Sequence, residues 1–153
     1  LRAPALRPDA NDPGESPLPE VQAAATALRA AYRAHGEDAR ARLEFGLAND
    51  ILNRNNVRAD TLLALWAALD DWCGRSACLP APHARLDLLT AEKLAGCVKK
   101  GRDGSTLVSP LFDAARDYLD AQATHAAWTA TREVALLHHV RALASRRLAQ
   151  VKR

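Results

Sequence analysis

Ser109-Pro110-Leu111-Phe112 opens the stretch that decides the fold, because the chain then continues to Arg153 with no further Gly or Pro. Ser109 suits the N-cap of a helix, where its hydroxyl oxygen can accept from a free backbone N–H, and Pro110 suits the first helical position, where no donor is needed. Apolar or small residues then follow at steps of three or four, the period of one helix face. They are Phe112, Ala115, Leu119, Ala123, Ala126, Ala130, Val134, Leu137, Val140, Ala144, Leu148 and Val151. The stretch therefore predicts a long C-terminal helix.

The length of this predicted helix leaves two arrangements open. Without a break it would extend about 66 Å at 1.5 Å per residue, well beyond the rest of a domain of this size. Thr124, Thr129 and Thr131 lower the helix propensity of residues 124–131, so a bend or break there is favoured. The alternative is a straight helix that projects and pairs with another chain.

The composition predicts an all-α fold. Hydrophobic residues make up 48% of the chain and are dominated by Ala and Leu, the strongest helix formers, whereas only 3 Trp, 2 Tyr and 2 Phe are present. Strands favour aromatic and β-branched residues, which are scarce here. No run of about 18 apolar residues, the length that a membrane-spanning helix needs, occurs in the sequence.

Turn-forming residues divide the chain before the long helix. Gly36 suits the end of a helix over 18–35, and further helices are predicted over 37–53, 58–72 and 90–100. With the C-terminal helix, these elements predict an irregular antiparallel bundle of four to six helices, forming a single helical domain over 18–153.

A proline-rich segment precedes this domain. Residues 1–17 contain Pro4, Pro8, Pro13 and Pro17, a composition typical of a flexible tail or linker. The sequence begins at Leu1 and contains no Met, so we expect either a processed product or a piece of a longer protein.

Two of the three cysteines lie close together in the sequence. Cys73 and Cys78 are separated by four residues that include Gly74, a spacing that allows a disulfide at a helix end. A bridge would favour an exported, periplasmic or secreted location over the cytoplasm. The alternative is that both are buried free thiols, as is expected for Cys97.

Catalytic, metal and cofactor motifs are absent from the sequence. No nucleophile with a matched base, no diagnostic metal-ligand spacing and no phosphate-binding loop is recognisable. His138 and His139 are adjacent, so on a helix they point about 100° apart and cannot bind one ion together. We therefore expect no catalytic residue, metal or cofactor. If the protein were an enzyme, its site would be expected in the polar group Asn49, Asp50, Asn53 and Arg54.

These observations favour a non-enzymatic binding or adaptor module, exported or virulence-associated in type, that uses a helical surface against a protein partner. The predicted partner face contains Trp128, Val134 and Leu137 on the long helix, which could also support oligomerisation. The alternative partner is nucleic acid, because the end of the chain is rich in cations. The candidate contacts with an anion or nucleic acid are Arg141, Arg146, Arg147, Lys152 and Arg153.

Overall fold

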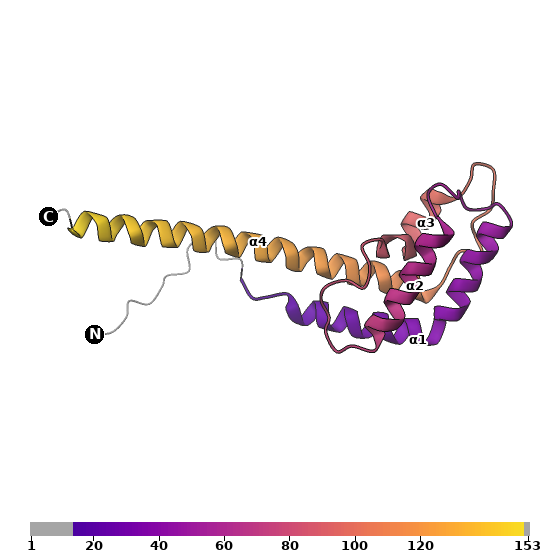
Figure 1. Ribbon diagram of the computed structural model, residues 1–153, viewed down its shortest axis with the longest axis horizontal. Helices are drawn as coiled ribbons and strands as arrows, with labels where there is room; N and C mark the ends of the chain where they lie inside the picture. Colours follow the sequence, from indigo (N-terminus) through magenta and orange to yellow (C-terminus); the bar gives the residue numbers. More distant parts are fainter. Residues whose placement is uncertain (1–13, 152–153) are drawn as a thin grey trace.

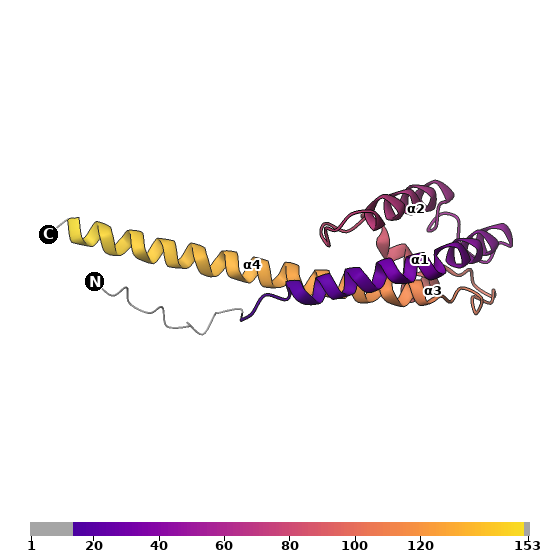
Figure 2. The same cartoon turned by 90° about the horizontal axis from the view of Figure 1, so that it is seen from below.

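A long C-terminal helix, α4 (Pro110–Val151), is the axis of the molecule, and α1 (Leu18–Ala48) packs antiparallel along its first half (Figures 1 and 2). The computed structural model describes residues 14–151. Between these two helices in sequence lie α2 (Ala59–Cys73), the short 3₁₀ helix η1 (Leu86–Leu89) and α3 (Ala91–Cys97). Within the described residues there is no β-strand, so the predicted all-α fold of four to six helices is confirmed.

The first two predicted helices are in fact one. α1 continues through Gly36 and ends at Ala48, whereas the sequence predicted a boundary at Gly36 and a second helix reaching Asn53. Gly36 is buried, and a Cβ added there would lie 3.1 Å from ring carbons of Tyr32. This glycine therefore allows close packing inside a helix instead of ending one. Figure 1 shows that α1 changes direction about halfway along, and a glycine is a common cause of such a bend.

Side chains from all these elements form one core around the first turns of α4. Tyr118 is fully buried, its ring meets that of Trp72 edge-on at 5.5 Å, and its hydroxyl donates to the carbonyl oxygen of Cys78 at 2.6 Å. The largest fully buried side chains are Tyr118, Phe112, Leu28, Leu43, Leu52, Leu65, Leu69, Leu86, Leu88, Leu89, Leu94 and Leu111. The core thus joins α1, α2, η1, α3 and the beginning of α4.

The expected bend or break in the long helix does not occur. α4 is one helix of 42 residues, about 63 Å long at 1.5 Å per residue, and its second half extends past the other helices (Figure 1). The hydroxyls of Thr124, Thr129 and Thr131 each donate at 3.0 Å to the carbonyl oxygen four residues earlier. Because each hydroxyl bonds within the helix, these threonines lower helix propensity without interrupting the backbone ladder.

The predicted tail of residues 1–17 lies mostly outside the described part of the chain. α1 begins at Leu18, directly after Pro17 at its N-cap. The division into tail and domain stays a prediction. Among the helices of residues 14–151, none has the length and apolar character needed to span a membrane.

Candidate functional site

The second half of α4 is the main surface feature of the molecule, and we call its residues 130–151 the projecting segment. Every large apolar side chain of this segment is at least half exposed, from 50% for Leu143 to 80% for Val151. The set comprises Val134, Leu136, Leu137, Val140, Leu143, Leu148 and Val151. In the rest of the described chain, large exposed apolar side chains are isolated cases such as Phe45, Leu63 and Val108. An exposed cluster of this size marks an interaction site more often than isolated residues do.

The exposed apolar residues share one side of the helix. At about 100° per residue, all seven lie within about 100° on either side of Ala144, so they cover roughly half of the circumference. This side continues the face that is buried earlier in α4 at Phe112 and Ala115. The stripe recognised in the sequence is therefore covered by the core in its first part and uncovered beyond it.

Trp128 marks the point where the covered part of α4 ends. Its indole Nε1 donates to the carbonyl oxygen of Gly14 at 3.2 Å, and its ring stacks with His125 at 6.1 Å between centroids. The guanidinium of Arg132 lies 5.1 Å from the centre of the same ring. Trp128 thus holds the segment that leads into α1 against α4.

The three residues of the predicted partner face do not lie on the same side of α4. Val134 and Leu137 belong to the exposed apolar side of the projecting segment, at 53% and 60% exposed. Trp128 lies about 160° around the helix from Ala144 and makes the internal contact with Gly14. The sequence alone could not predict that Leu136, Leu143 and their neighbours would be as exposed as Val134 and Leu137. The apolar residues recur with the same period where α4 faces the core and where it is uncovered.

The predicted basic contacts do not form one surface. Arg141, Arg146 and Arg147 are all exposed, and helical geometry places them about 100–140° apart around α4. Lys152 and Arg153 lie outside the described residues. Arg141 and Arg147 lie on opposite sides of the exposed apolar residues and Arg146 faces away from them, so the three guanidinium groups do not form a continuous basic patch of the kind expected for phosphate binding.

The predicted disulfide between Cys73 and Cys78 is absent, and these residues and Cys97 are free thiols. Contacts elsewhere in the fold explain why. The loop after α2 is held against α1 and α4: Arg29 donates to the carbonyl oxygen of Ala77 at 2.6 Å, and Tyr118 donates to that of Cys78. Because the loop is tied to other helices, it does not fold back onto the end of α2.

Burial also affects the chemistry of the cysteines. It raises the pKa of the thiols of Cys73 and Cys97, so both resist forming the reactive thiolate. As free thiols, these cysteines give no reason to expect an oxidising compartment.

The polar group proposed for an enzyme serves the turn between α1 and α2. Asn49 donates to the carbonyl oxygen of Phe45 at 2.9 Å, and Arg54 donates to that of Leu47 at 3.1 Å. Asp50 adopts a positive φ of 59° and pairs with Lys99, and this hydrogen bond lowers the pKa of its carboxyl group. These interactions close the end of α1 and join the turn to the region after α3.

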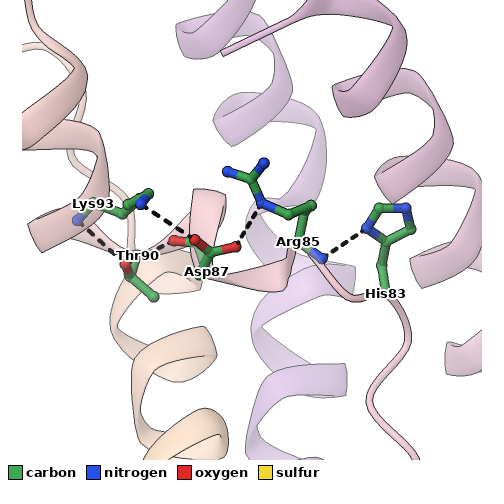
Figure 3. A network of polar contacts seen from close by, with 5 residues as sticks. All are labelled: His83, Arg85, Asp87, Thr90 and Lys93. Atoms are coloured by element: carbon green, nitrogen blue, oxygen red, sulfur yellow. Dashed lines mark hydrogen bonds and ion pairs between the residues drawn. The ribbon is translucent and has the colours of Figure 1, made fainter. Parts of the chain in front are cut away.

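A pocket of about 600 Å³ lies beside η1 and α3, and it is lined by all the residues drawn in Figure 3 except His83. Asp87 accepts from Arg85 Nε at 3.2 Å and lies 3.6 Å from Lys93 Nζ, while the Thr90 hydroxyl caps α3 by accepting from the backbone N–H of Lys93. His83 Nδ1 accepts from the backbone N–H of Arg85 at 3.0 Å. The drawn groups thus hold one another in place and order the chain around the start of α3.

Neither metal binding nor a known relative points to an activity. No group of three or more potential ligands among residues 14–151 is placed to hold a metal ion. Comparisons of this chain with known protein families, with characterised proteins and with solved structures find no match.

Proposed function

We propose that this protein is a non-enzymatic binding module that docks a helix of a protein partner on the projecting segment of α4. The observation that carries the proposal is the row of seven large apolar side chains, each at least 50% exposed, on one side of that segment. At roughly 100 Å² for each side chain they present about 700 Å², close to the ~800 Å² per partner of a standard interface.

The remainder of the fold supports this role as a rigid mount. α1 packs along the first half of α4, and Trp128 fixes the segment before α1 at the point where that packing ends. A helix that is anchored in a core over its first turns presents its free half with little loss of conformational entropy on binding.

A helix is the partner that the spacing of the surface fits best. Apolar side chains at steps of three and four form ridges that interlock with those of a second helix. A helix that lies on a membrane carries Trp, Phe or Leu on its apolar face, and of these the projecting segment has only Leu and lacks the aromatic anchors. The dispersed arginines described above likewise disfavour nucleic acid as the main partner.

Position-specific crosslinking tests the proposal. We would place the photoreactive residue p-benzoylphenylalanine at Leu143 of the full chain and irradiate cells of the native host. The matched control carries it at Leu63 of α2, which is 72% exposed but lies outside the projecting segment. We expect a protein adduct from position 143 and none from position 63, and we expect Leu137→Asp to abolish it without changing the free energy of unfolding.

Three outcomes would contradict the proposal. Equal labelling from both positions would show that exposure alone decides, and an adduct that survives Leu137→Asp would show that the apolar side is not used. An adduct with nucleic acid instead of protein would favour the alternative, for which affinity should also fall steeply with salt.

A further inference from the structure

We infer that the partner helix is acidic, with Asp or Glu on both borders of its own apolar stripe, and that Arg141 and Arg147 of this chain select it. This inference rests on the proposed function and deepens it, since it concerns the same projecting segment. It follows from where the charges lie relative to the centre of the apolar side.

The centre of the exposed side is a narrow stripe. Ala144 lies at its middle, and helical geometry places the other members within about 40° of it. They are Leu137, Val140, Leu148 and Val151. The small side chain of Ala144 lets a second helix approach most closely at this point.

An arginine borders the stripe on each side. Arg141 precedes Ala144 by three residues and Arg147 follows it by three, so the two lie about 60° to either side of the centre. These are the places that flank the seam between paired helices, where charged side chains choose the partner. Arg146 lies about 160° from Ala144 and faces away from any helix docked on the stripe.

Both bordering guanidinium groups are available to a partner. Arg141 and Arg147 are exposed, and neither forms an ion pair with any residue of 14–151. The one acidic residue of the projecting segment, Glu133, lies about 20° from the line of Ala144, but it precedes Arg141 by eight residues, about 12 Å along the axis. The two charges that border the stripe on either side of Ala144 are thus both positive.

This pattern argues against a second copy of the chain as the occupant. In either orientation, two copies would bring arginine-bordered edges together, and each copy lacks acidic residues on those borders. Arginines about 60° from the centre of the apolar face can also reach lipid headgroups, so an anionic membrane is the competing surface, and the vesicle measurement below distinguishes it from an acidic helix. An acidic amphipathic helix satisfies both the apolar stripe and the two cations.

Two designed peptides test the inference on the full chain. Both are amphipathic helices with the same leucine stripe, one bordered by Glu and the other by Lys, and binding is measured by fluorescence anisotropy. We expect the Glu-bordered peptide to bind about tenfold more tightly, since two favourable pairs replace two repulsive ones. The double variant R141E/R147E should reverse this preference, while the control R146E should keep it.

The outcomes of this experiment distinguish a failure of the inference from a failure of the proposed function. Equal affinity for the two peptides, with both lost in Leu137→Asp, would overturn the inference and leave helix docking standing. A wild-type chain that forms a dimer at micromolar concentration, or that binds phosphatidylglycerol vesicles more tightly than either peptide, would also overturn it. If neither peptide binds and position 143 gives no adduct in cells, both proposals are wrong.

Discussion

The same substitution at two positions of α4 should lower stability strongly at one and hardly change it at the other, because the helix is buried in one half and exposed in the other. Leu111 is 0% exposed, whereas Leu143 is 50% exposed. Leu111→Ala would leave a cavity among packed side chains, which typically costs about 2–5 kcal/mol. At about 2–4 °C per kcal/mol for a chain of this size, the melting temperature should fall by roughly 4–20 °C.

Leu143→Ala should behave differently. It removes no buried contact, and Ala is the better helix former, so the free energy of unfolding should change by less than about 0.5 kcal/mol. The same variant should nevertheless weaken binding of a partner helix. The pair of variants therefore separates a stability defect from a binding defect on one helix.

Urea unfolding followed by tryptophan fluorescence measures this difference. Trp66 and Trp72 are 4% and 5% exposed, so their emission reports on the core and not on the projecting segment. Dilute protein should be used, so that association does not add to stability. If Leu143→Ala lowers stability as much as Leu111→Ala does, the second half of α4 packs against the core in solution, and the reasoning from its exposure is refuted.

Three further results are expected from the core and the cysteines. Tyr118→Phe should lower the free energy of unfolding, measured by urea titration, by about 1–3 kcal/mol, because the carbonyl oxygen of Cys78 loses its hydrogen-bond donor inside the protein. An unchanged free energy of unfolding would show that this hydrogen bond is not formed. Burial raises the pKa of Tyr32 and Tyr118 to about 12, so the neutral phenols stabilise the fold below pH 10 and this contribution is lost as the pH rises toward 12. Absorbance at 295 nm should therefore show tyrosinate at pH 11 only after denaturation, and ionisation of both phenols near pH 10 in the folded protein would contradict it. Alkylation after unfolding without reductant should modify three thiols in the intact mass, whereas one would restore the Cys73–Cys78 bridge.

Local sequence signals were sufficient where the decisive contacts are local. Ser109 caps α4 as predicted, its hydroxyl accepting from the backbone N–H of Leu111 at 3.3 Å, and α2 lies within one residue of the predicted range 58–72. Helix caps and intrinsic propensities act over a few residues, so a single sequence contains the information that they need.

Local sequence signals gave wrong predictions where burial, or a contact with a distant part of the chain, determines the structure. Gly36 resembles a helix end by composition, yet α1 continues through it, and its backbone is buried with the ring of Tyr32 close by. The spacing of Cys73 and Cys78 allows a bridge, but contacts from Arg29 and Tyr118 hold their loop elsewhere. The contacts from Arg29 and Tyr118 come from distant parts of the chain, so they cannot be inferred from the residues around the cysteines.

The candidate site shows the same division most clearly. Composition and periodicity alone determined an all-α protein with a long apolar stripe near its C-terminus, because helix propensity and the 3.6-residue period are written in the chain itself. Only the tertiary structure decided which part of that stripe is a core and which is a surface. The stripe is buried at Phe112 and Ala115 and already exposed at Ala123 and Ala126, so its covered part ends between Ala115 and Ala123. Since the stripe has the same chemistry on both sides of that point, burial depends on the reach of a neighbouring helix, which no local pattern encodes.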